Sequence, residues 1–384
     1  MSDKKQILIV FTGELGIGGI ERSLISLLKN INYSKYSVDL FLYAHRGELF
    51  NQIPKQVNIL PEIKELSYLR NSLSDKIKHG CFKASFWRLY AECKKSSIDD
   101  AYRHLLNFTI PKHYDLAISF FRPFDLIKKC VSADIKVGWI HTDYTVEEDR
   151  NAREDYRGLD KIVAVSDSVK QSFIKILPEY KDKVEVIENI YDITYIKQKS
   201  MQFIADMEIP KGDWIKILSV GRFTKAKSFE RIPYIVSKLK ILGINLKWYL
   251  IGWGIEESNI KHEIELNNVQ DQVIVLGKKE NPYPYMLACD VYIHPSLYEG
   301  KSVCVKEAQI LGKPVIITDY PTSKSQLVDG YDGIIIPYEI NDCIINLYDI
   351  LSNKNKLERI ALGVKSSNYD NSNEVEKVYA LMGD

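Results

Sequence analysis

The sequence predicts an α/β chain built from two doubly wound parallel-sheet domains. Short apolar runs alternate with amphipathic stretches in both halves, which is typical of parallel strands joined by crossover helices. The length of 384 residues exceeds what one hydrophobic core usually organises. The strand pattern also stops once, after Asn189, and starts again near residue 215. These features together favour two domains of similar size.

Each half contains a set of strand-like runs. The first set lies at 6–11, 37–43, 116–120, 136–140, 161–165 and 184–187. Residues 207–212 then form a polar stretch with Pro210 and Gly212, so we expect a linker near 190–212. The second set lies at 215–220, 247–251, 273–276, 291–294, 314–318 and 333–336. We therefore expect a first domain over 1–190 and a second over 212–367.

Composition excludes several classes of protein. With 45% apolar and 27% charged residues the chain is neither disordered nor collagen-like. The formal net charge of +1 gives no overall attraction to nucleic acid, so we expect no nucleic-acid partner. The six cysteines lack zinc-site spacing and are interpreted as reduced core thiols. No apolar run reaches the ~18 residues of a membrane span, so we expect a cytoplasmic protein.

A glycine-rich turn follows the first strand. It contains Gly18 and Gly19 and leads into an amphipathic helix at 23–29. Backbone N–H groups in such a turn can approach an anion, and the helix N-terminus adds partial positive charge. A purely structural role for the glycines stays open. The spacing differs from the dinucleotide fingerprint Gly-x-Gly-x-x-Gly, which argues against a nicotinamide-dependent oxidoreductase.

The first strand of the second domain ends in a loop with two cations. Gly221 and Arg222 follow the strand directly, and Lys227 comes five residues after Arg222. A guanidinium can hold two phosphate oxygens at once and an ammonium adds a point charge, so the loop suits a diphosphate. The alternative is a solvated basic loop.

Two carboxylates eight residues apart follow the run at 291–294. Glu299 is expected in the loop after this strand, and Glu307 in a helix that starts near Ser302. Carboxylates accept hydrogen bonds from sugar hydroxyls, and the N–H groups of residues 300–303 can hold phosphate. A pair of glutamates at this spacing also occurs often by chance.

The segment from Glu299 to Glu307, with its flanking Tyr-Glu-Gly and Glu-Ala, resembles the Glu-(seven residues)-Glu signature of the retaining family 4 glycosyltransferases, also called group 1. Val220-Gly221-Arg222 with Lys227 resembles that family's phosphate-binding loop. Residues 18–22 resemble its N-terminal glycine loop, and 161–169 its last-strand pattern. Order and spacing agree over nearly the whole chain.

The resemblance implies a GT-B fold, in which two facing Rossmann-like domains have a cleft between them. It implies that 1–190 binds the acceptor and that 212–367 binds the nucleotide sugar. The final helix of this family usually crosses back, so we expect residues from about 368 to 384 to pack on the first domain.

The resemblance also implies roles for single residues. Glu307 would bind the ribose hydroxyls, Glu299 the hydroxyls of the transferred sugar, and Arg222 and Lys227 the diphosphate. The further donor contacts that we expect come from Gly18, Gly19, Gly221, Lys278, Gly300, Lys301, Ser302 and Val303.

The loop after Glu299 departs from the family pattern. Many relatives have Gly-Phe-Gly-Leu there, whereas this chain has Gly300-Lys301-Ser302-Val303. Lys301 either adds a charge near the phosphates or lies in solvent. Ser302 either donates its hydroxyl or caps the helix.

His141 follows the strand-like run at 136–140 and is expected at a ligand-binding edge. A lone histidine is more often structural, but the resemblance favours a catalytic role near the donor sugar. Asp143 either binds acceptor hydroxyls or caps the next element.

The predicted reaction is metal-independent sugar transfer. Arg222, Lys227 and two helix N-termini can stabilise the charge on a leaving nucleoside diphosphate, and the sequence contains no Asp-x-Asp. We expect no metal or other cofactor, a nucleotide-sugar donor with UDP favoured over GDP, and a glycan or lipid-linked glycan acceptor. The resemblance implies retention of configuration. A sugar-nucleotide epimerase of GT-B fold and a catalytically silent binding subunit remain alternatives.

One segment departs from neutrality. Residues 61–113 hold ten Lys or Arg against six Asp or Glu, with Phe82, Phe86, Trp87 and Tyr90 among them. This pattern fits either an ordinary solvated helix pair or a surface that touches anionic lipid or a lipid-pyrophosphate acceptor at the inner face of a membrane.

Overall fold

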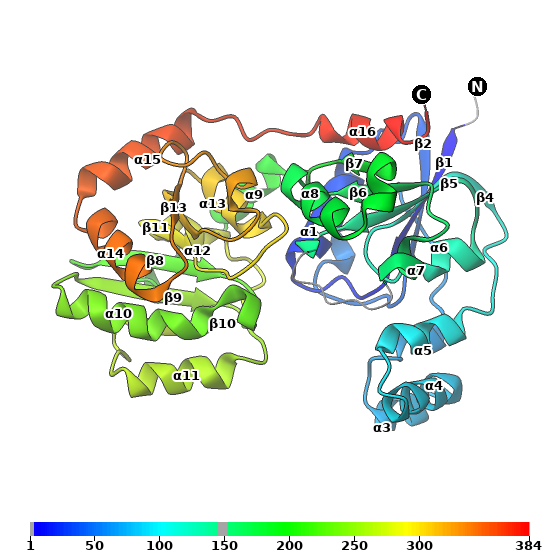
Figure 1. Cartoon of the computed structure of the whole chain (residues 1–384), viewed down its shortest axis with the longest axis horizontal. Helices are drawn as coiled ribbons and strands as arrows, with labels where there is room; N and C mark the ends of the chain where they lie inside the picture. Colours follow the sequence, from blue (N-terminus) through cyan, green and yellow to red (C-terminus); the bar gives the residue numbers. More distant parts are fainter. Residues whose placement is uncertain (1–3, 145–151, 384) are drawn as a thin grey trace. The chain divides into compact units, whose positions relative to one another are not determined.

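The structure of the chain, a computed structural model, describes residues 4–144 and 152–383. Two compact units can be distinguished (Figure 1). The first unit comprises Met1–Ile190 and Ser372–Asp384, and the second comprises Tyr191–Asn371. Each unit is built around its own parallel sheet.

The sheet of the first unit has the order β3-β2-β1-β4-β5-β6-β7, and its strand pairs are parallel. The order reverses between β1 and β4, which makes this edge the switch point where doubly wound sheets bind ligands. The strands are β1 Lys5–Phe11, β2 Tyr36–Leu42, β3 Asn58–Ile59, β4 His113–Ser119, β5 Ser132–Ile140, β6 Lys161–Ala164 and β7 Val184–Val186.

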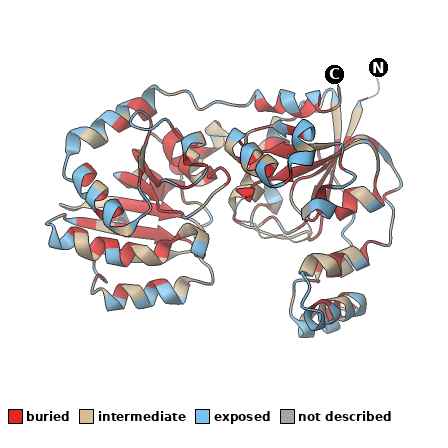
Figure 2. Cartoon of the chain, viewed as in Figure 1, coloured by how far each residue is buried: buried red, intermediate tan, exposed pale blue. Residues whose placement is uncertain are grey.

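Several helices of the first unit bury an apolar face. α1 turns Leu24, Leu27 and Leu28 into the core, as the helical spacing of these residues requires. Figure 2 shows the resulting pattern, with buried strands and helices exposed on one side. The helices are α1 Gly19–Asn30, α2 Lys64–Ser67, α3 Leu73–Lys78, α4 Phe82–Cys93, α5 Ile98–Leu105, α6 Asp125–Cys130, α7 Ala152–Tyr156, α8 Asp167–Ile176 and α16 Glu374–Ala380.

The sheet of the second unit has the order β10-β9-β8-β11-β12-β13 and is also parallel. Its order reverses between β8 and β11. The strands are β8 Ile215–Val220, β9 Leu246–Ile251, β10 Val273–Gly277, β11 Val291–His294, β12 Val315–Thr318 and β13 Ile334–Ile336. The helices are α9 Ile193–Ser200, α10 Ile232–Ile241, α11 Glu257–Leu266, α12 Tyr283–Ala288, α13 Val303–Ile310, α14 Ile340–Leu351 and α15 Lys354–Ser366.

The predicted fold class is therefore confirmed: the chain forms two parallel sheets with crossover helices. Most strands lie within a residue or two of the predicted bounds. β4 and β5 begin three and four residues earlier than predicted, because polar residues such as His113 and Asp134 occupy their exposed ends. β3 was not predicted, since two residues carry no readable periodicity.

The segment near 190–212 differs from the linker that we expected. It folds as α9 and a 3₁₀ turn at Ala205–Met207, and both belong to the second unit. Ile196 and Ile209 are buried in that unit's core. Glu208 pairs with Lys279, so polar residues that suggested a linker instead fix the segment to its own unit.

Residues 372–383 pack on the first unit through α16. The ring of Tyr379 stacks on Tyr36 of β2, with 4.0 Å between the ring centroids. The Tyr379 hydroxyl accepts a hydrogen bond of 2.8 Å from the N–H of Asn32. Within the described part of the chain, no helix combines the length and the apolar character that a membrane crossing requires.

Candidate functional site

Two loops of the second unit meet at the carboxyl ends of β8 and β11, the paired strands at its switch point. The first loop runs over 221–228 and the second over 295–302. The N–H of Leu297 donates a 2.8 Å hydrogen bond to the carbonyl oxygen of Ala226, which joins the two loops directly. The parallel topology thus brings together residues that lie some seventy positions apart in the sequence.

Lys227 and Glu299 form an ion pair across these loops, with Lys227 Nζ on Glu299 Oε1. Only 21% of the lysine side chain and 11% of the glutamate side chain are exposed. Ser228, which follows Lys227, has a left-handed backbone with φ of 54° and ends the short 3₁₀ turn that presents the lysine. Two of the predicted site residues therefore contact each other in this structure.

Glu299 Oε1 accepts two further hydrogen bonds. The Nε2 atom of His294 and the hydroxyl of Ser296 each lie 2.7 Å from it. Burial by itself raises the pKa of Glu299, but the Lys227 ammonium and the hydrogen bond from His294 outweigh it and hold this pKa well below the usual range. The carboxylate is consequently ionised at neutral pH.

His294 was not singled out from the sequence. It is the last residue of β11, is fully buried, and lies with Nδ1 3.3 Å from the Tyr292 hydroxyl. Burial lowers the pKa of His294, while the neighbouring Glu299 acts in the opposite direction. A neutral ring that donates from Nε2 satisfies these contacts. Its place at the end of a switch-point strand was the signal that could have identified it.

The N-terminus of α13 is held by Gln326 instead of by its own serine. The N–H of Ser302 donates a 2.7 Å hydrogen bond to Gln326 Oε1, so this N–H is already occupied. The Ser302 side chain makes no capping bond, and its hydroxyl lies 3.1 Å from His294 Nε2. Of the two roles considered for Ser302, capping is therefore wrong. Lys301 is only 9% exposed, so it does not extend into solvent.

The remaining predicted residues of the second unit follow β8 or β10, or lie at the start of α13 or within it. Glu307 is buried in α13 and accepts a 2.7 Å hydrogen bond from the Tyr283 hydroxyl of α12. Arg222 is exposed beside Gly221, whose N–H donates to the carbonyl of Ile251. Lys278 is exposed and lies 4.7 Å from the centroid of the Trp253 ring. Gly300 and Val303 are buried at the start of α13.

His141, Gly18 and Gly19 belong to the first unit. His141 follows β5, is 9% exposed, and donates from Nε2 to the carbonyl oxygen of Phe120 at 2.8 Å. Burial lowers the pKa of His141 to about 4, although this hydrogen bond acts in the opposite direction. Asp143 is fully buried two residues further on. His141 is therefore a neutral imidazole at pH 7, and Nδ1 is its hydrogen-bond acceptor.

The glycine turn of the first unit already has a carboxylate at the start of its helix. A side chain at Gly18 would lie 2.1 Å from Oε2 of Glu21, which lies in the first turn of α1. Gly18 precedes α1 as its N-cap residue with an extended backbone. A side chain at position 18 would therefore require the Glu21 carboxylate to move.

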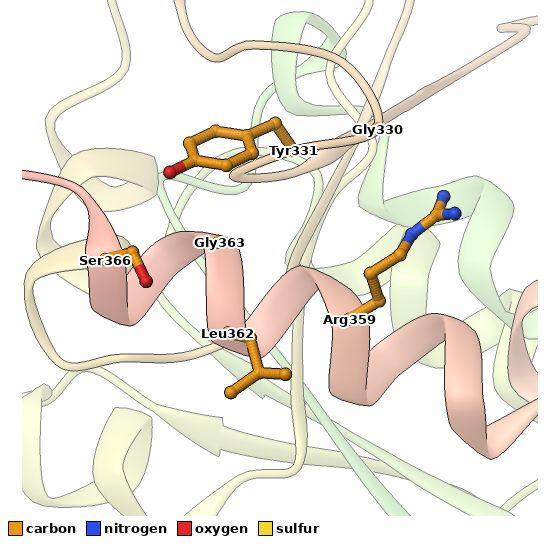
Figure 3. Close-up of a pocket in the computed structure, with 6 residues that line it drawn as sticks. All are labelled: Gly330, Tyr331, Arg359, Leu362, Gly363 and Ser366. Carbon is orange, nitrogen blue, oxygen red and sulfur yellow. The ribbon is translucent and has the colours of Figure 1, made fainter.

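No set of three or more His, Cys, Asp or Glu residues suited to a metal ion occurs among the described residues. Figure 3 shows a surface pocket of the second unit, lined by residues of α15 and of the segment before β13. Tyr331 precedes β13 and Arg359 and Leu362 project from α15, so this pocket shares no residue with the loops after β8 and β11.

Comparison with known proteins identifies the second unit. Residues 202–364 match the family of group 1 glycosyl transferases. This match lies within the second unit. The matched range contains Arg222, Lys227, Glu299 and Glu307, and the predicted family resemblance is confirmed.

The chain spans less than half of the length of two curated relatives that match it. The chain is 30% identical to the N-acetylgalactosamine-N,N'-diacetylbacillosaminyl-diphospho-undecaprenol 4-alpha-N-acetylgalactosaminyltransferase of Campylobacter jejuni. The match extends over 155 residues, which make up 40% of each chain. The chain is 24% identical over 183 residues to the O-antigen biosynthesis glycosyltransferase WclY of Escherichia coli, which is 48% of this chain and 49% of that one.

A solved structure resembles the chain over 99% of both lengths. It is the crystal structure of Anabaena Alr3699/HepE in complex with UDP, with a TM-score of 0.69 and 16% sequence identity. At this identity the likeness concerns the fold, and it confirms the GT-B fold class.

The buried His141 predicts how the stability of the first unit depends on pH. Because its pKa is lowered from 6.5 to about 4, the unfolded chain binds a proton below pH 6.5 that the folded chain does not. Stability is therefore lost as the pH falls, by up to about 3 kcal/mol near pH 4. Hydrogen exchange of β4 and β5 peptides at several pH values, after correction for intrinsic exchange rates, measures this loss.

His141→Gln should reduce the pH dependence, because an amide can still donate to Phe120 and does not titrate. His113→Gln is the matched control, since His113 is exposed on β4 of the same unit. An equal pH dependence in the wild-type chain and His141→Gln would contradict the assignment.

Proposed function

We propose that the chain is a retaining glycosyltransferase that moves a hexose or N-acetylhexosamine from a UDP-sugar to a glycan or lipid-linked glycan. The arrangement of Arg222, Lys227, Glu299 and Glu307 around the switch point of a group 1 glycosyltransferase domain carries this proposal. The UDP bound to the structurally similar Alr3699/HepE supports the choice of nucleotide. The names of the Campylobacter and Escherichia relatives support an acceptor in surface polysaccharide synthesis.

In this proposal the second unit binds the donor. Arg222 and Lys227 hold the diphosphate, and Lys227 exchanges its contact with Glu299 for phosphate oxygens. Glu307, oriented by the Tyr283 hydroxyl, accepts hydrogen bonds from the ribose. Glu299 accepts them from the transferred sugar. The N-terminus of α13 adds partial positive charge, although the Ser302 N–H is bonded to Gln326.

The chemistry follows from these charges. The bond between the anomeric carbon and the diphosphate oxygen breaks, and the negative charge that develops on the leaving group is stabilised by Arg222 and Lys227. The acceptor oxygen then bonds to the anomeric carbon from the same face, and the proton of its hydroxyl passes to the departing diphosphate oxygen. Fixed side-chain cations supply the charge stabilisation that a metal ion supplies in other transferases, so the reaction needs no metal.

The first unit binds the acceptor in this proposal. His141 is neutral at pH 7, and its Nδ1 can accept a hydrogen bond from a sugar hydroxyl. With a pKa of about 4 it is a weak base. We therefore propose that His141 orients a sugar hydroxyl and transfers no proton.

Nucleotide release from a panel of UDP-, GDP- and ADP-sugars, measured with EDTA present, tests the proposed function. We expect one UDP-sugar to be turned over. Arg222→Ala should lower kcat/KM by about 100-fold, because it removes a charged donor to the diphosphate. Lys225→Ala is the matched control, since Lys225 is an exposed lysine of the same loop and should retain nearly full activity.

Two results would contradict the function. Release that needs a divalent metal would exclude the proposed charge stabilisation. Tight donor binding without turnover, even when glycan acceptors are supplied, would favour the silent binding subunit.

A surface on α3 and α4 supports a lipid-linked acceptor. Phe82 and Phe86 are 67% and 60% exposed and lie one turn apart on α4, where they can share a face. Exposed lysines accompany them, including Lys78 and Lys83. Aromatic and cationic side chains together suit the interface of an anionic membrane. Figure 1 shows α3, α4 and α5 in the cyan part of the first unit.

Flotation with vesicles that contain phosphatidylglycerol tests this surface. The double variant Phe82→Glu/Phe86→Glu should bind at least about 10-fold more weakly than the wild-type chain, because it removes apolar insertion and reverses charge. Leu266→Glu is the control, since Leu266 is 64% exposed on α11 of the second unit. No binding by the wild-type chain, or equal loss in both variants, would contradict the membrane contact.

A further inference from the structure

The two carboxylate oxygens of Glu299 have different surroundings. Lys227, His294 and Ser296 all donate to Oε1. Within the described residues, no side chain donates to Oε2. One oxygen is therefore fixed by the protein, and the other can accept a hydrogen bond from a ligand.

Donor binding changes this balance. Under the proposed function Lys227 moves to the diphosphate, and Glu299 loses the cation beside it. A carboxylate with 11% of its side chain exposed is then stable only if other donors hold it. The two donors that remain on Oε1 are His294 Nε2 and the Ser296 hydroxyl.

His294 is the more rigid of these donors. It lies on β11, is 0% exposed, and its ring stacks on Tyr292 at 6.1 Å between centroids. Nε2 faces the ionised Glu299 carboxylate, which can only accept, so Nε2 carries the proton, and Nδ1 lies 3.3 Å from the Tyr292 hydroxyl. The Ser296 hydroxyl can rotate, whereas the imidazole is held on both ring nitrogens.

We propose that His294 is a positioning residue for Glu299: its Nε2–H holds Oε1 when Lys227 moves to the diphosphate, and this aims Oε2 at a hydroxyl of the transferred sugar. The inference rests on the proposed function and goes beyond it, because it assigns to His294 the discrimination between a nucleotide and a nucleotide sugar. His294 itself contacts neither the sugar nor the phosphates.

The test compares His294→Gln with His294→Asn in the full chain. The Gln amide can reach Oε1 from nearly the position of Nε2, whereas the shorter Asn amide cannot. For each variant we would measure the Kd of UDP and the kcat and KM of the UDP-sugar that the wild-type chain turns over.

We expect the UDP Kd to stay within about 3-fold of the wild-type value in both variants, because the diphosphate and ribose contacts are unchanged. We expect His294→Asn to lower kcat/KM for the UDP-sugar by about 10- to 100-fold, through loss of a hydrogen bond to a charged group. His294→Gln should retain activity within about 5-fold of the wild-type chain.

Gln309→Leu controls for general destabilisation. Gln309 is also buried in the second unit, where it donates to the carbonyl of Asp332. Gln309→Leu should lower the Tm and should leave unchanged the kcat/KM for the UDP-sugar relative to the Kd of UDP.

Two results would overturn the positioning role while leaving the transferase function intact. One is equal activity of the Gln and Asn variants, and the other is a kcat/KM for the UDP-sugar that is unchanged relative to the Kd of UDP in His294→Asn. A wild-type chain that binds no nucleotide sugar would overturn both.

Discussion

The ion pair of Lys227 and Glu299 constrains the candidate site more than any other contact that we describe. Both side chains are largely buried, and a buried charge without a partner is costly, so each residue needs another charged or hydrogen-bonding partner when the pair opens. The pair fixes the loop after β8 against the loop after β11. Two backbone features hold the loops where these side chains meet. Ser228 has a left-handed backbone, and the N–H of Leu297 donates a hydrogen bond to the carbonyl oxygen of Ala226.

This constraint depends on the topology of the sheet. β8 and β11 are neighbours although β9 and β10 intervene in the sequence, and their carboxyl ends open at the same edge. The groups at this edge are already satisfied by one another: Lys227 by Glu299, the Ser302 N–H by Gln326, and Glu307 by Tyr283. A ligand that binds at this edge replaces some of these contacts. The contacts that remain hold the side chains in the orientation in which they bind the ligand.

The sequence predicted the features that depend on local pattern. Buried parallel strands read as apolar runs, so the two sheets and their order of appearance were accessible, and the glutamate spacing pointed to the family. β3 has two residues and offered no pattern. The segment from 191 to 212 looked like a linker because its polar residues are visible in the sequence. Glu208 in this segment contacts Lys279 and Tyr285, which lie more than seventy residues further along the chain.

The contacts within the site were not predictable for the same reason. His294 and Gln326 act through hydrogen bonds to residues that only the fold brings near them. Ser302 has the residue type and position of a helix cap, yet Gln326 takes that role through tertiary contact. Lys301 is buried although lysine is usually exposed, which no local rule indicates.

A crystal structure of the full chain with UDP bound would test the central claim most directly. We expect the diphosphate at the loops after β8 and β11, with Lys227 Nζ moved from Glu299 to a phosphate oxygen and His294 Nε2 still bonded to Glu299 Oε1. UDP bound elsewhere, or UDP at these loops beside an unbroken pair of Lys227 and Glu299, would contradict it.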